Sequence, residues 1–150
     1  MNTPIEKRAR LAARELSRRL RDSNTSKQFG FELEAVGEGR AVLKMRVAER
    51  HKQVHGVVHG GILAALADTA GGLATYLVVP PGTRVATVEM KINYLEPVAG
   101  GIVIAEAKVL RRGKNLAIVD CDLRDEKERL VSKALMTFSI GPTKRKGRRD

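Results

Sequence analysis

One carboxylate stands alone in a long apolar segment that begins with two glycines. The segment runs from residue 60 to residue 81, and Asp68 is its only charged residue. Its larger apolar side chains recur at the spacing of one helical face: Ile62, Leu66, Ala70, Leu73 and Leu77. The opposite face places Asp68 among small residues: Ala64, Ala65, Gly71, Gly72 and Thr75. Glycine inside a helix is less favourable than alanine by about 1 kcal/mol, so we expect another backbone or a ligand to approach this face. A solvated surface Asp is the alternative.

The two glycines that precede the apolar segment suggest what the carboxylate acts on. Gly60 and Gly61 form a turn whose backbone allows close approach, and the first amides of a helix have no acceptor within that helix. Such amides bind an anion or the oxyanion that develops during acyl transfer. Asp68 follows two turns later and is a candidate general base toward a substrate held nearby.

These residues resemble a known family. The segment His59-Gly60-Gly61, followed by Leu66-Ala67-Asp68, resembles the signature of hotdog-fold acyl-CoA thioesterases of the phenylacetate-pathway (PaaI-like) type. Residues 87–97 (TVEMKINYLEP) are similar to that family's strand after the helix, and the resemblance extends over about residues 30–140. It implies hydrolysis of a CoA thioester to a free acid and CoA, with no cofactor besides the CoA of the substrate.

The resemblance also implies roles for individual residues. The amide side chain of Gln53 and the N–H of Gly60 would together hold the thioester carbonyl, unless Gln53 is an ordinary solvated loop residue. Asp68 would activate water or act as a nucleophile that forms an anhydride, in a site shared between two subunits. Thr87 would help hold the water, its alternative being an ordinary strand residue. Some relatives carry a hydroxyl one turn after the carboxylate, where this chain has Gly72.

Substrate binding involves further candidates near the ends of the predicted elements. His59 is expected to orient its loop through a backbone hydrogen bond, and Gly61 is a further substrate-binding candidate. Arg111, Arg112 and Lys114 cluster at a predicted hairpin tip, where they either bind the phosphates of CoA or are simply solvated. CoA enters here only as part of the substrate.

Metal binding is not expected. The histidines at 51, 55 and 59 have a spacing that would suggest zinc on a helix. The residues between them predict a loop, and no Cys or Asp completes a ligand set. The chain also contains no Walker-type loop and no dinucleotide-binding fingerprint.

Charge is concentrated at the two ends of the chain. The net charge is +11 over 150 residues. Residues 1–28 carry eight Lys and Arg against three Asp and Glu, and residues 143–150 carry five against one. The segment between them is therefore nearly neutral. Specific nucleic-acid binding is not expected, because the basic ends lack the aromatic residues on which bases stack.

The remaining composition favours a single cytoplasmic domain. A single cysteine, Cys121, excludes an intramolecular disulfide and is expected to be a buried thiol. The charged N-terminus lacks the apolar region of a secretory signal. Asp68, four glycines and Pro80-Pro81 make residues 60–81 a buried central helix and not a transmembrane segment.

The periodicity predicts an α+β hotdog fold, in which an antiparallel sheet wraps around one long central helix. Strands are expected at about 31–35, 41–47, 84–95, 102–112, 116–124 and 130–140. Residues 49–58 are expected to form a loop too polar to pack. Residues 4–21 predict an amphipathic helix that docks on the body, with binding to an acidic membrane surface as the alternative. The division is thus a basic arm (1–28), a hotdog domain (29–142) and a disordered basic tail (143–150).

The sequence therefore predicts an acyl-CoA thioesterase that forms a homodimer and, from two dimers, a homotetramer. One alternative is a hotdog hydratase or dehydratase, which needs a catalytic His paired with Asp or Glu. The others are a non-catalytic acyl-CoA-binding protein and a nucleic-acid binder. The turn at Gly60 and the position of Asp68 inside the helix favour hydrolysis. The identity of the acyl group depends on the pocket and not on the motif.

Overall fold

The computed structural model describes residues 4–142, with side chains from residue 10 onward. It contains α1 (Pro4–Asp22), α2 (Asn24–Phe29), β1 (Phe31–Gly37), β2 (Arg40–Arg46), the 3-10 helix η1 (Glu49–His51), α3 (Gly60–Tyr76), β3 (Val85–Tyr94), β4 (Ile102–Arg112), β5 (Leu116–Asp125) and β6 (Leu130–Ile140). The predicted strands and the two long helices are thus confirmed to within a few residues. The predicted tail, 143–150, lies outside the described residues.

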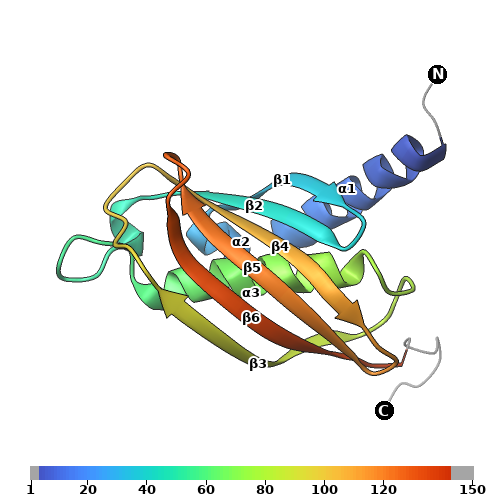
Figure 1. Cartoon of the computed structure of the whole chain (residues 1–150). Helices are drawn as coiled ribbons and strands as arrows, with labels where there is room; N and C mark the ends of the chain where they lie inside the picture. Colours follow the sequence, from blue (N-terminus) through green and yellow to red (C-terminus); the bar gives the residue numbers. More distant parts are fainter. Residues whose placement is uncertain (1–3, 143–150) are drawn as a thin grey trace, which may run out of the picture.

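The six strands form one antiparallel sheet that curves around α3 (Figure 1). The strand order is β1-β2-β4-β5-β6-β3, so β3 follows α3 in the chain but lies at the far edge of the sheet. This edge has no neighbouring strand among the described residues, and most side chains of β3 are exposed. The predicted α+β arrangement of one long helix held by a sheet is what the structure has.

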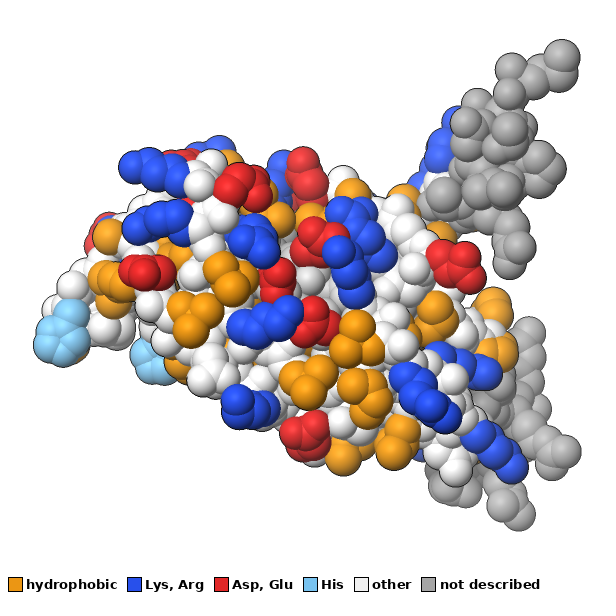
Figure 2. Space-filling model, in the orientation of Figure 1, with side chains coloured by type: hydrophobic (Ala, Val, Ile, Leu, Met, Phe, Trp, Pro, Cys, Tyr) orange, Lys and Arg blue, Asp and Glu red, His pale blue; other side chains and the backbone are white. Residues whose placement is uncertain are grey.

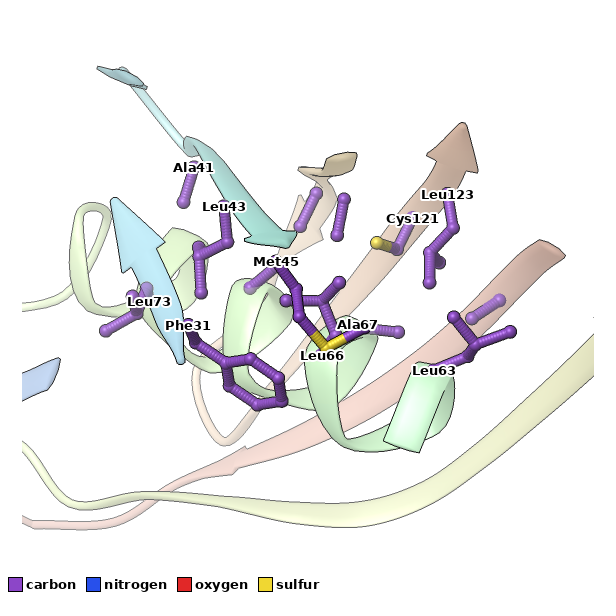
Figure 3. Packing of buried hydrophobic residues seen from close by; sticks show 14 of the residues in the cluster. Phe31, Ala41, Leu43, Met45, Leu63, Leu66, Ala67, Leu73, Cys121 and Leu123 are labelled. Atoms are coloured by element: carbon purple, nitrogen blue, oxygen red, sulfur yellow. The ribbon is translucent and has the colours of Figure 1, made fainter. Parts of the chain in front are cut away.

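The core lies between α3 and the concave face of the sheet. Alternate residues of β4, β5 and β6 are buried there, as the period of two requires. Phe138 is the largest fully buried side chain, and Leu43, Met45, Leu66 and Leu123 are the next largest (Figure 3). Cys121 is part of this core, and burial raises the pKa of its thiol well above the usual range. The prediction of a buried thiol is therefore confirmed.

The glycines of α3 differ from each other in a way that the sequence did not indicate. A Cβ on Gly71 would lie 2.7 Å from Cε of Met136 and 2.9 Å from Cε2 of Phe138, so Gly71 faces β6 of its own chain. A Cβ on Gly72 would make an ordinary 3.7 Å contact with Phe138. The expectation that another backbone or a ligand approaches the whole small-residue face is therefore wrong for Gly71, and it is also wrong for Thr75, which is buried. The face that stays partly open is narrower and includes Ala64, Ala65, Asp68, Thr69 and Gly72.

The N-terminal arm docks through the second half of α1. Leu16 and Leu20 are buried and belong to the same cluster as Phe31 of β1. The guanidinium of Arg19 lies 4.1 Å from the ring centroid of Tyr76 at the end of α3. Figure 1 shows the first half of α1 projecting beyond the sheet. The short α2 was not predicted, because six residues are too few to display a helical period; Ser23 caps it by accepting a hydrogen bond from the Ser26 N–H at 3.2 Å.

The segment between β2 and α3 is more firmly packed than its polarity predicts. His51 is fully buried, and its Nδ1 accepts a hydrogen bond from the Ala48 N–H at 3.0 Å. The backbone oxygen of His51 accepts from the His59 N–H at 2.8 Å. The prediction of an unpacked polar loop is therefore wrong here, because one buried imidazole anchors the loop. None of the described helices is both long and apolar enough to cross a membrane.

Candidate active site

The first turn of α3 leaves one amide free. His59 caps the helix: its Nδ1 accepts a hydrogen bond from the Gly61 N–H at 2.9 Å, which is the backbone interaction predicted for this side chain. The N–H of Ile62 donates to the His59 oxygen at 2.9 Å, and that of Leu63 approaches it at 3.4 Å. Within residues 4–142 no acceptor takes the Gly60 N–H. Of the two predicted glycine donors, only Gly60 is thus available to a ligand.

Gln53 presents a second donor from the preceding loop. Its Oε1 accepts a hydrogen bond from the His55 N–H at 2.6 Å, which leaves its NH₂ group without a partner among the described residues. The Gln53 N–H donates to the Val57 oxygen at 2.9 Å, beside a β-bridge between Lys52 and Val58. This narrow turn runs directly into α3. Gln53 therefore lies on the approach to Gly60 with its donor end unoccupied.

Asp68 lies in the middle of α3 and is paired with β3. The hydroxyl of Thr87 donates a hydrogen bond to Oδ1 of Asp68 at 2.6 Å. A β-bulge at Val88 separates Thr87, which faces the helix, from Glu89, which faces the outer side and accepts from Thr137 at 2.7 Å. The structure thus brings the two predicted residues Asp68 and Thr87 together, and it uses the Thr87 proton to hold the carboxylate.

The free amide of Gly60 and the carboxylate of Asp68 lie far apart along α3 of a single chain. Eight residues separate Gly60 from Asp68 on α3, which corresponds to about 12 Å along a helix axis. A general base has to lie within hydrogen-bond reach of the proton it removes, directly or through one water. The chain therefore has two candidate half-sites, one at the start of α3 and one in its middle.

The basic hairpin tip lies at the other end of α3 from Gly60. Val109 of β4 packs near Gly39, which also lies close to Val78, just after the end of α3. The basic residues follow Val109, so the structure does not bring them beside the Gly60 of their own chain.

The register of the sheet separates two of these cations. A bulge at Leu110 pairs Arg111 with Ile118 on the outer face and Arg112 with Ala117 on the inner face. Arg112, Ala117, Phe138 and Thr87 form one row across four strands. Arg112 thus shares the face of Thr87, whereas Arg111 belongs to the outer face, where charges of both signs mix (Figure 2).

Sequence reasoning assigned no role to Tyr94. Its hydroxyl donates to the backbone oxygen of Gly60 at 2.9 Å, and its ring lies beside a mostly apolar groove of about 360 Å³. The groove is lined by Val57, Leu63, Leu95, Glu96 and Val98, among others. No periodicity could have indicated this contact, because it joins residues 34 apart in the sequence.

The histidines do not converge. His51 is buried, His59 caps α3, and His55 is exposed in the loop between them. Figure 2 shows exposed histidine side chains at the end of the molecule where α3 begins. Among the residues that the structure describes, no group of three or more His, Cys, Asp or Glu side chains is placed to hold a metal ion.

A single helix inside an antiparallel sheet, with a free amide at its start and a carboxylate in its middle, defines the hotdog class that the sequence resembles. The model of the Thioesterase superfamily matches residues 55–132. The chain belongs to this family. The predicted resemblance, the hotdog fold and the class of enzyme, a thioester hydrolase, are thereby confirmed.

Individual relatives agree with this membership. A 1,4-dihydroxy-2-naphthoyl-CoA hydrolase of Listeria monocytogenes is 30% identical over 112 residues, which cover 75% of this chain and 91% of the relative. A thioesterase structure from Haemophilus influenzae has a TM-score of 0.79 and 30% identity, covering 99% of this chain and 97% of the other. The PaaI protein of Escherichia coli, from the phenylacetic acid degradation operon, has a TM-score of 0.79 at 25% identity, covering 88% and 95%.

Proposed function

We propose that the protein is an acyl-CoA thioesterase whose active site is completed by a second copy of the chain. The observation that carries the proposal is the division of the site. Two uncommitted donors precede the carboxylate: the Gln53 amide lies in the loop before α3, and the Gly60 N–H lies at the start of α3, about 12 Å along the helix from Asp68. A second copy related by a twofold axis brings the Asp68 of each chain to the donors of the other.

In the shared site, the two donors bind the thioester carbonyl oxygen and stabilise the negative charge that develops on it during attack. Asp68 of the partner accepts a proton from the attacking water, and CoA leaves as the thiol. A nucleophilic Asp68, which forms an anhydride that water then hydrolyses, uses the same geometry. Thr87 holds the carboxylate in place through its 2.6 Å hydrogen bond in either case. No cofactor takes part.

Two further observations support a partner at this face. Asp68 is flanked on the open side of α3 by small residues that allow close approach, and the neighbouring edge strand β3 is largely exposed. An unpaired edge strand is a ready template for pairing with another chain. The named CoA hydrolase among the relatives supports CoA as the thiol. The homotetramer and the cytoplasmic location stay predictions from the sequence.

The test is release of free CoA thiol from a panel of aryl and aliphatic acyl-CoA esters of increasing length. We expect turnover of at least one class by the wild-type protein and no matching turnover by Asp68→Asn. Hydration of an enoyl-CoA without thiol release would support the dehydratase alternative instead. Binding of acyl-CoA without either reaction would make the protein a non-catalytic binder.

A further inference from the structure

The peptide group between Gly60 and Gly61 is held at both of its polar ends by side chains. Its oxygen accepts a hydrogen bond from the Tyr94 hydroxyl at 2.9 Å, and its N–H donates to Nδ1 of His59 at 2.9 Å. The N–H is one of those that a helix start leaves without a partner inside the helix, and here a side chain satisfies it while a second side chain binds the oxygen of the same peptide, so the two bonds form a clamp. Neither side chain needs this bond in order to be buried, because both Tyr94 and His59 are exposed.

The clamp fixes the orientation of the adjacent amide. The Gly60 N–H belongs to the preceding peptide group, whose orientation depends on rotation about the two backbone bonds of Gly60. Glycine restricts these rotations least of all residues, and a Gly-Gly pair at the first turn of a helix is prone to fray. On the other side, the His59 N–H is bound to the His51 oxygen at 2.8 Å. The Gly60 amide is therefore held between two anchored neighbours.

The Tyr94 ring also explains why residue 60 is glycine. A Cβ at this position would lie 3.0 Å from Cζ and 3.3 Å from the hydroxyl oxygen of Tyr94. A side chain at this position would require the ring to shift by a few tenths of an ångström from where it now meets Gly60. Glycine thus leaves room for the Tyr94 ring. The hydrogen bonds from Tyr94 and to His59 in turn restrict the backbone rotation that glycine otherwise allows.

We propose that Tyr94 is a positioning residue for the proposed oxyanion-binding amide of Gly60. It acts through the Gly60–Gly61 peptide and not on the substrate, with His59 holding the other end of the same peptide. This inference rests on the proposed function for its effect on turnover. The clamp itself can be measured without turnover.

The test compares the only two tyrosines of the chain, Tyr94 and Tyr76. Tyr94→Phe removes the hydroxyl and keeps the ring beside Gly60. Tyr76→Phe is the matched control, because it removes the same atom at the opposite end of α3 and keeps the ring that Arg19 covers. Because an oxyanion donor matters only in the transition state, Tyr94→Phe should lower kcat about tenfold with little change in KM. The control should leave both near the wild-type values.

Amide hydrogen exchange provides the readout that does not depend on catalysis. In the full-length protein, the hydrogen-bonded amides of residues 61–63 should exchange faster in Tyr94→Phe than in the wild type and stay slow in Tyr76→Phe. The melting temperature of Tyr94→Phe should match that of the control, since the lost hydroxyl is exposed. Unchanged exchange at 61–63 would overturn the inference, whatever the activity. Faster exchange with wild-type kcat would remove Tyr94 from the mechanism while leaving the thioesterase assignment intact.

Partial rescue sharpens the same test. His59→Ala removes the acceptor of the Gly61 N–H, whereas His59→Asn keeps an acceptor suited to a helix N-cap. If both side chains act on one peptide, adding Tyr94→Phe to His59→Ala should lower kcat by less than the product of the two single effects. His59→Asn should recover part of the kcat that His59→Ala loses. Fully independent effects would contradict the shared clamp.

Discussion

The two half-sites of α3 are built in opposite ways. The start of the helix offers only donors, carries no formal charge, and is fixed by hydrogen bonds from the loop and from β3. The middle offers a carboxylate on a face of small residues, fixed by the hydroxyl of Thr87. Acyl transfer by the proposed mechanism needs both the donors at the start of α3 and the carboxylate in its middle. Under the proposed mechanism, the folded chain holds both chemical components in place, about 12 Å apart along one helix, and a second copy brings them together.

The largest effect is expected from removing the carboxylate. Asp68→Asn keeps the size of the side chain and can still accept from Thr87, so the fold should be retained. Turnover of any good acyl-CoA substrate should fall about a hundredfold or more, the range that loss of a general base produces. Steady-state kinetics with circular dichroism as the folding control provide the measurement. Near-normal turnover would remove Asp68 from the mechanism and leave the second half-site without a function.

A smaller loss of turnover is expected when Asp68 is kept but no longer receives the hydrogen bond from Thr87. Thr87→Val removes the 2.6 Å hydrogen bond to Asp68, and we expect kcat to fall about tenfold, as when an orienting hydrogen bond to a catalytic group is lost. Thr137→Val is the matched control: it removes a 2.7 Å hydroxyl–carboxylate bond to Glu89 on the outer face of the same sheet. Equal kcat values for the two variants would mean that Thr87 is an ordinary strand residue.

The hairpin tip tests whether the partner also supplies a phosphate ligand. Arg112 lies on the inner face in the row that contains Thr87, and Arg111 lies on the outer face. If the tip binds CoA across the subunit boundary, Arg112→Gln should raise KM for acyl-CoA about three- to tenfold, the scale of one exposed charge-assisted contact. Arg111→Gln should have a weaker effect. Identical KM values for both variants and the wild type would mean that the basic side chains of the hairpin tip are solvated and do not bind the substrate.

The smallest expected effect is on the pH dependence of stability, and it comes from His51 in the loop that carries Gln53. Burial, and then the nearby Arg50, lower the pKa of His51 below its usual range, so the folded protein keeps this imidazole neutral. Below about pH 6.5, His51 binds a proton in the unfolded chain but not in the folded chain. His51 therefore stabilises the fold fully above that pH, and its contribution is lost as the pH falls toward its lowered pKa.

Urea unfolding between pH 7.5 and 5.5 measures this contribution. The wild type should lose free energy of unfolding on acidification, by at most about 1.4 kcal/mol per pH unit from one group. His51→Gln should flatten that dependence, whereas His55→Gln, which changes an exposed imidazole, should preserve it. The same slope in His51→Gln and in the wild type would show that another group causes the acid sensitivity.

The sequence was most informative where the evidence is local. The spacing of the strands, the long helix and the lone Asp68 depend on periodicity within one segment, and these were predicted closely. Contacts between residues of distant segments were not predicted. Gly71 faces β6 and not a partner, His51 is buried by its loop, and Tyr94 reaches back to Gly60. Each of these depends on how strands pair around the helix, which a single sequence leaves open.

Mixed dimers test the division of the active site most directly. Asp68→Asn and Gln53→Ala, each inactive on its own, are unfolded, combined in equal amounts and refolded, with an affinity tag on one variant to prove that heterodimers form. In a shared site, each heterodimer contains one site with both defects and one with neither, so random pairing restores about a quarter of all sites. If each chain held a complete site, every site would keep one defect. Heterodimers without restored hydrolysis would contradict the shared site.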